Sequence, residues 1–181
     1  MEKVKAHIVS WLKAYSDVSN TGGFVIGVSG GIDSAVTSIL CAETHKKVLV
    51  LNMPIRQSEK EYARAEAHID NLKKRYSNVS SHELNLSSVF ESFENVMPFD
   101  IESNGLSLAN SRARLRMMTL YAVAQANGLL VAGTGNKVED FGIGFYTKYG
   151  DGGVDISPIA DCNKTEVWEL GKELGILKEI I

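Results

Sequence analysis

The sequence predicts an α/β protein built on one doubly wound parallel sheet of about five strands, with helices on both faces. Short apolar runs alternate with helical patterns along the 181 residues, which is the order expected of parallel strands joined by crossover helices. The runs are apolar at consecutive positions, as in strands that are buried on both faces. Two of them end in small polar residues, and ligands in such sheets bind at the carboxyl ends of the strands.

The first half of the chain alternates helix and strand. Apolar residues spaced three or four apart predict the helices, and continuous apolar runs predict the strands. In order, we expect a helix over 2–20, a strand over 24–28, a helix over 33–45, a strand over 48–53 and a helix over 58–76. Ser58 followed by Glu61 is a capping box, which marks the start of the last of these helices.

The second half continues the pattern with weaker signals. In order, we expect a polar edge strand over 79–86, a weak helix over 87–97, a connection over 98–105, a long helix over 107–127, a strand over 129–134 and a short fifth strand over 154–159. A final helix starts at Asn163, with Glu166 as its capping partner. In the long helix, Arg112 and Arg116 share a face and Arg114 points away from them, because successive residues turn by about 100°.

Composition narrows the class of protein. The 19 basic and 22 acidic side chains give a net charge of −3, which provides no electrostatic case for nucleic acid or a membrane as the main partner. Cys41 and Cys162 form no CxxC pair and no disulfide framework, as is usual in a reducing cytosol. No apolar run reaches the ~18 residues of a membrane span. We therefore expect a single cytoplasmic domain covering residues 1–181.

The stretch FVIGVSGGIDS, residues 24–34, predicts an anion-binding turn. An apolar strand leads into Ser29, Gly30 and Gly31, whose small side chains let backbone N–H groups approach a ligand. The following helix adds its positive N-terminal end. A carboxylate beside a bound polyphosphate requires a divalent cation between the two, so Asp33 predicts Mg²⁺ as well. The alternative is a glycine-rich turn that binds nothing.

This turn is not a Walker A loop, because Ile32 and Asp33 follow the glycines where that motif has a lysine. A second polar stretch runs from Thr134 to Lys164. Its glycine-rich part over 141–153 has neither helical nor strand period and is expected to be a loop. Because both stretches follow parallel strands, they should face one another across the same edge of the sheet.

The motif SGGIDS resembles the SGGxDS signature of the N-type ATP pyrophosphatases, which include NAD synthetase, GMP synthetase, asparagine synthetase and tRNA-modifying enzymes. Two further stretches, GFYTKYGDGGVDISPIADCNKTEV and NSRARLRMMTLYAVAQ, are similar to the ammonia-dependent NAD synthetases within that superfamily. Together the matches cover roughly residues 24–175. The resemblance implies an adenine nucleotide alpha hydrolase-like, Rossmann-like fold, and a C-terminal segment that would follow residue 181.

The resemblance also implies site residues. Asp33 and Glu139 would hold Mg²⁺, and Glu139 could instead be a solvated loop acid. Arg114, Lys148 and Asp155 would contact deamido-NAD, and Arg114 could instead be an ordinary surface arginine. The residues that would contact ATP are Gly27, Val28, Ser29, Gly30, Gly31, Ile32, Asp33, Ser34, Thr134 and Lys164.

The implied reaction is the amidation of deamido-NAD to NAD by ammonia, through an adenylated intermediate, with release of AMP and pyrophosphate. It requires no protein nucleophile, which agrees with the lack of a Ser–His or Cys–His pattern. Family resemblance further implies a homodimer. Two alternatives remain at this point: another SGGxDS enzyme, such as a GMP synthetase-like or tRNA-modifying one, and a non-catalytic nucleotide-binding module.

Overall fold

The computed structural model describes all residues, 1–181, and centres on a parallel sheet of four strands in the order β3-β2-β1-β4. The sheet order places the earliest strand of the chain, β1, next to the latest, β4. Every pairing is parallel, so all four carboxyl ends lie at one edge. The strands are β1 Gly23–Gly27, β2 Lys47–Asn52, β3 Val79–Glu83 and β4 Leu130–Val131.

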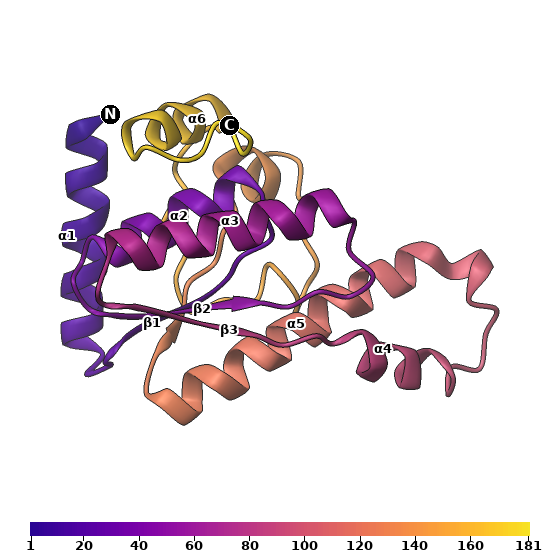
Figure 1. Cartoon of the computed structure of the whole chain (residues 1–181). Helices are drawn as coiled ribbons and strands as arrows, with labels where there is room; N and C mark the ends of the chain where they lie inside the picture. The colour runs from indigo at the N-terminus through magenta and orange to yellow at the C-terminus, as the bar shows by residue number, and fades with distance from the viewer.

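Helices cover both faces of the sheet. Figure 1 shows α2 and α3 on one face and α5 on the other, with α6 beyond α2. A short 3₁₀ turn precedes α5, and a π-helical turn follows β4. The helices are α1 Glu2–Val18, α2 Ile32–Ala42, α3 Glu59–Arg75, α4 Ser87–Glu94, α5 Gly105–Asn127 and α6 Lys164–Glu173. None of them is long and apolar enough to span a membrane.

The core explains why the inner strands are apolar at every position. In β2, Val48 and Val50 belong to the apolar cluster under α2 and α3, whereas Leu49 and Leu51 pack with the α5 side chains on the opposite face. Successive strand residues point to opposite faces, so a strand between two helical layers needs no polar position. β3 is the edge strand and is mostly exposed, in agreement with its polar sequence.

The capping predictions agree with the structure. The Ser58–Glu61 capping box begins α3, and the Asn163 N–H donates to the Glu166 carboxylate at the start of α6, 2.7 Å away. α5 ends at Gly128, whose φ of +63° is the left-handed conformation that glycine adopts most easily. The predicted connection over 98–105 contains the 3₁₀ turn at Glu102–Asn104.

The fold class is confirmed, but the sheet has four strands where about five were expected. The predicted fifth strand over 154–159 forms one isolated parallel bridge, between Ala132 and Ile156. β4 is also shorter than the expected strand over 129–134. One cause is that the Asp155 carboxylate accepts the Val131 N–H, 2.8 Å away, so a side chain takes the place of a ladder partner. Another is Pro158, which has no N–H to continue the pairing.

Candidate active site

The turn between β1 and α2 is packed tightly against the start of α3. Gly30 has a φ of +82°, and a Cβ atom there would lie 2.5 Å from the Glu61 carbonyl oxygen and 3.1 Å from the Ala65 nitrogen. Both neighbours are backbone atoms that cannot move aside independently. Only glycine satisfies the positive φ and the close approach together. Gly30 therefore allows the turn to pack directly against the backbone of α3.

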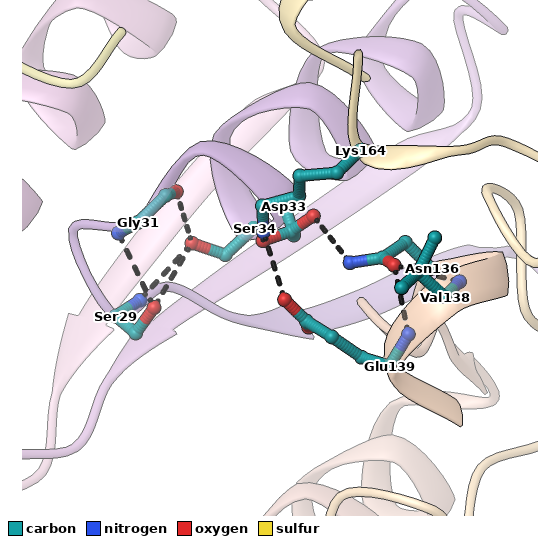
Figure 2. Close-up of polar contacts among 8 residues, drawn as sticks. All are labelled: Ser29, Gly31, Asp33, Ser34, Asn136, Val138, Glu139 and Lys164. Carbon is teal, nitrogen blue, oxygen red and sulfur yellow. Dashed lines mark hydrogen bonds and ion pairs between the residues drawn. The ribbon is translucent and has the colours of Figure 1, made fainter. Parts of the chain in front are cut away.

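Two hydroxyl groups brace the same turn (Figure 2). The Ser34 hydroxyl donates to the Gly31 carbonyl at 3.0 Å and accepts the Ser29 N–H at 3.3 Å. The Gly31 N–H donates to the Ser29 hydroxyl at 3.3 Å. These bonds hold the turn open in front of α2. They show that Ser29 and Ser34 shape the turn, in addition to any contact they make with a ligand.

The first amides of α2 are available to an anion. Ile32, Asp33 and Ser34 have no intrahelical acceptor for their N–H groups because they form the first turn of the helix. Gly31 lies immediately before them in an extended conformation, with a φ of −95°. These amides point out of the N-terminus, where the helix dipole is positive. The turn therefore has the geometry of the predicted anion cradle.

The structure brings Asp33 and Glu139 together at the carboxyl edge of the sheet. The Lys164 ammonium group contacts both, at 2.5 Å from Asp33 Oδ2 and 3.0 Å from Glu139 Oε1. Figure 2 shows the three side chains converging from α2, from the π-helical turn Lys137–Gly142 and from the start of α6. Burial lowers the pKa of Lys164, but its hydrogen bonds to the two carboxylates outweigh this and raise the pKa overall. The ammonium therefore stays charged.

Asn136 also links the two carboxylate residues. Its Nδ2 donates to Asp33 Oδ1 at 3.1 Å, and its Oδ1 accepts the N–H groups of Val138 and Glu139, each at 3.1 Å. The side chain is fully buried.

Further acids lie around the pair. Asp140 is so close to Gly135 that a Cβ atom on Gly135 would lie 1.7 Å from its Oδ2. Burial raises the pKa of Asp140, and the charges of Asp151, Glu139 and Asp33 raise it further. The raised pKa of Asp140 therefore reflects, beside its burial, the negative charges that are concentrated around it. Such a site favours a cation between the acids and the phosphates that the cradle would bind.

Two cavities meet at the cradle. The smaller one, of about 140 Å³, is lined by Asp33, Ser34, Glu139 and Asp140. The larger one, of about 620 Å³, extends between α3 and α5. Both are lined by Ser29, Gly31, Thr134 and Asp151, so they form one continuous depression.

The larger cavity combines an apolar wall with a basic rim. Gly27, Met53, Met117 and Leu120 contribute to the wall. Its arginines come from the loop after β2, from α3 and from α5; they are Arg56, Arg64, Arg112 and Arg116. A cavity that has an apolar wall and guanidinium groups at its border suits a nucleoside that carries phosphates.

The three residues predicted to contact deamido-NAD, Arg114, Lys148 and Asp155, line neither cavity. Arg114 Nε donates to the Lys148 carbonyl at 3.1 Å, so these two residues are neighbours. Asp155 is engaged within the fold: it accepts the Tyr121 hydroxyl at 2.9 Å as well as the Val131 N–H. Burial, followed by this contact, raises the pKa of Tyr121 to about 12. Asp155 thus fastens β4 to α5.

Sequence reasoning missed Asn136 and the basic rim of the cavity. The helical spacing predicted that Arg112 and Arg116 lie on the same face of the helix, and both residues line the cavity. Gln57, which donates to the Ser29 carbonyl at 3.0 Å, gave no signal in the sequence. The Asn136 contact with Asp33 spans 103 residues, and no local pattern announces a contact of that range.

Comparison with known proteins agrees with this geometry. The chain is 39% identical to the NH(3)-dependent NAD(+) synthetase of Carboxydothermus hydrogenoformans, over 99% of this chain and 73% of that protein. It is 37% identical to the enzyme of the same name from Methanosarcina acetivorans, over 99% and 70% of the two chains.

Solved structures are similarly close. The NMN synthetase of Francisella tularensis superposes with a TM-score of 0.91 at 34% identity, covering 99% of this chain and 72% of that one. The NH3-dependent NAD synthetase of Campylobacter jejuni gives 0.90 at 30% identity, with 99% and 76% covered. The sequence profile of the NAD synthase family matches residues 4–181. This chain therefore belongs to the NAD synthase family.

Proposed function

We propose that the chain is a carbon–nitrogen ligase that amidates deamido-NAD to NAD with ammonia, using ATP and releasing AMP and pyrophosphate. The observation that carries the proposal is the convergence of Asp33 and Glu139 on one ammonium group beside the free amides of α2. Relatives that bear the name NH(3)-dependent NAD(+) synthetase support the same reaction. We take residues 1–181 as a single synthetase domain.

ATP would lie in the continuous depression with its phosphates at the turn and its adenosine in the larger cavity. Its β- and γ-phosphates would accept the N–H groups at the N-terminus of α2, as anions do at exposed helix N-termini. Its adenosine would then enter the larger cavity, with the apolar wall against the base. Thr134 lines both cavities and lies where the two parts of the nucleotide would join. Lys164 would reach the phosphates from the carboxylate side.

The residues present suit Mg²⁺. Asp33 and Glu139 supply hard carboxylate oxygens, which Mg²⁺ prefers. No group of three or more His, Cys, Asp or Glu side chains forms a closed metal cage. Mg²⁺ in nucleotide sites is commonly bound by one or two carboxylates, with phosphates and water completing the octahedron. When bound, the ion would neutralise charge on the leaving pyrophosphate.

The reaction needs an activated carboxylate. A nicotinate carboxylate resists attack by ammonia because its leaving oxygen is strongly basic. Its oxygen would attack the α-phosphorus of ATP, breaking the bond to pyrophosphate and forming an acyl-adenylate. The α2 amides and Lys164 stabilise the charge that builds up on the pyrophosphate. Ammonia then attacks the acyl carbon, AMP leaves with the bonding electron pair, and the nitrogen loses a proton.

The deamido-NAD contacts and the homodimer are parts of the same proposal. Arg114 and Lys148 are adjacent and carry the positive charge expected near a dinucleotide. Large apolar side chains are exposed on two helices, which supports pairing with a second copy; they are Trp11 and Tyr15 on α1, and Leu106 and Met118 on α5. Light scattering after size-exclusion chromatography should give twice the monomer mass.

A substrate assay tests the function. The purified chain should convert ATP, Mg²⁺, ammonium and deamido-NAD into equal amounts of AMP, pyrophosphate and NAD. Nicotinate mononucleotide is the second acceptor to test, because a solved structure that resembles this chain is an NMN synthetase. Turnover with the mononucleotide alone would reassign the acceptor within the same chemistry. Pyrophosphate release with xanthosine monophosphate and neither nicotinate would overturn the proposal.

A further inference from the structure

Asn136 is a buried polar residue that the proposed reaction does not use. It follows β4 and begins the π-helical turn that carries Glu139. Its side chain is 0% exposed, so it cannot contact solvent. A buried amide must be satisfied by hydrogen bonds within the protein. Its bonds therefore show what the fold uses it for.

The amide orientation is fixed by its partners. Two backbone N–H groups, from Val138 and Glu139, point at one atom of the Asn136 amide. That atom must be the acceptor oxygen, because an NH₂ group cannot accept them. The opposite atom is then the donor, and it faces Asp33 Oδ1 at 3.1 Å. The same side chain thus fixes a carboxylate on α2 and the backbone that carries the other carboxylate (Figure 2).

The contact orients Asp33 without neutralising it. Asp33 has two side-chain partners: the neutral amide on Oδ1 and the charged Lys164 on Oδ2. A neutral donor leaves the full negative charge available to a dication. An aspartate at position 136 would keep the acceptor but lose the donor, and would place a further carboxylate against Asp33. Serine would keep an acceptor for the N–H groups but is too short to reach Asp33.

We infer that Asn136 is a positioning residue, which fixes Asp33 and the backbone of Glu139 relative to each other so that both carboxylates can bind one Mg²⁺ ion. It acts through these two carboxylates and touches neither the metal nor the nucleotide. The inference rests on the proposed function, because it assigns Mg²⁺ to the pair. Residues that orient metal ligands in this way typically alter metal affinity about 10- to 100-fold when they are replaced.

The test measures the coupling between metal and nucleotide, without turnover. Binding of α,β-methylene-ATP, whose α–β linkage cannot be cleaved, is titrated calorimetrically with Mg²⁺ and with EDTA. Mn²⁺ binding, followed by electron paramagnetic resonance, gives an independent readout. The variants are Asn136→Ser and Asn136→Asp. The control is Asn78→Ser, which removes two hydrogen bonds to the Ala42 and Lys46 carbonyls, far from the site.

In wild type, Mg²⁺ should strengthen binding of the analogue. In EDTA, Asn136→Ser should bind the analogue with the affinity of wild type. The increase in affinity that Mg²⁺ brings should be about 10- to 100-fold smaller in this variant than in wild type. Asn136→Asp should lose at least as much. The control variant should melt at a lower temperature and keep the full gain.

A folded Asn136→Ser protein with the full metal gain would overturn the inference and leave the proposed function intact. If Asn136→Ser does not fold, Asn136→Asp supplies the same comparison, because it retains the oxygen that caps the turn. Wild type without any metal-dependent gain would instead count against the Mg²⁺ assignment, and with it against the inference. The two failures are therefore distinguishable.

Discussion

Replacing Gly30 with alanine should destabilise the fold, whereas the same replacement at the next residue, Gly31, should mainly weaken nucleotide binding. The two glycines differ in what surrounds them. A Cβ atom on Gly30 meets backbone atoms of α3 at 2.5 and 3.1 Å, and its φ is +82°. At Gly31, with a φ of −95°, the nearest atom to a Cβ would be the Ser29 hydroxyl oxygen, 3.4 Å away.

The cost at Gly30 has two parts. An L-residue in the left-handed region costs about 1–2 kcal/mol. Moving α3 backbone to relieve the overlap costs about 1–3 kcal/mol, as for other overpacked sites. The sum is about 2–5 kcal/mol, which for a domain of this size lowers the melting temperature by roughly 4–20 °C. For Gly31→Ala, the loss is a few tenths to about 1 kcal/mol, since alanine is a poorer N-cap than glycine.

The binding effects should run in the opposite order. Gly31 lines both cavities, so an added methyl group stands where the phosphates approach the α2 amides. Loss of one such hydrogen bond corresponds to about tenfold in affinity. Differential scanning calorimetry gives the melting temperatures, and calorimetric titration of α,β-methylene-ATP with Mg²⁺ gives the affinities. A Gly30→Ala protein as stable as wild type would refute the packing argument. An unchanged affinity in Gly31→Ala would refute the phosphate placement.

Other predictions follow from the carboxylate pair and from the core. Asp33→Asn should reduce the rate of pyrophosphate release at least about 100-fold and should melt within a few degrees of wild type. A large drop in melting temperature would indicate instead that Asp33 has a structural role. Lys164→Met should weaken binding of the ATP analogue about 10-fold or more. The contacts with Asp33 and Glu139 outweigh burial and raise the pKa of Lys164, so this side chain should stay charged between pH 6 and 9. The affinity of wild type for the ATP analogue should therefore not fall through deprotonation of Lys164 in that range. Burial, and then the charge of Arg75, lower the pKa of His68 to about 4 from 6.5. The unfolded chain therefore binds the proton first as pH falls, so stability should be full above pH 6.5 and should decline by up to about 3 kcal/mol towards pH 4. Urea unfolding of wild type and His68→Gln measures this, and an equal decline in the variant would assign it to other groups.

The topology could be predicted because strong local signals agree with one global arrangement. The apolar runs that became β1 and β2, the Ser58 capping box and Gly128 each reflect chemistry within a few residues. Right-handed crossovers then require parallel strands whose carboxyl ends share an edge. For that reason the two polar stretches that contain Asp33 and Glu139 were expected to face one another, although they are far apart along the chain. The pairing of these two carboxylates was implied by the family resemblance.

The errors and omissions come from contacts that no local pattern contains. The stretch around Ile156 has a strand-like sequence, but its pairing is limited to one bridge, because Asp155 uses its side chain on Val131 and Tyr121. The contact of Asp155 with deamido-NAD was expected from the family resemblance alone, and it stays a prediction. Asn136 was missed because an asparagine after a strand is common, and only the folded chain shows its amide against Asp33.

A crystal structure with α,β-methylene-ATP and Mn²⁺, recorded at the manganese absorption edge, would show whether Asp33 and Glu139 bind the metal beside the phosphates. We predict one strong anomalous peak within coordination distance of Asp33 and Glu139, with the β- and γ-phosphates on the amides of Ile32, Asp33 and Ser34. Lys164 should have moved from the carboxylates to a phosphate oxygen. An anomalous peak elsewhere, or phosphates bound away from the N-terminus of α2, would rule out this site.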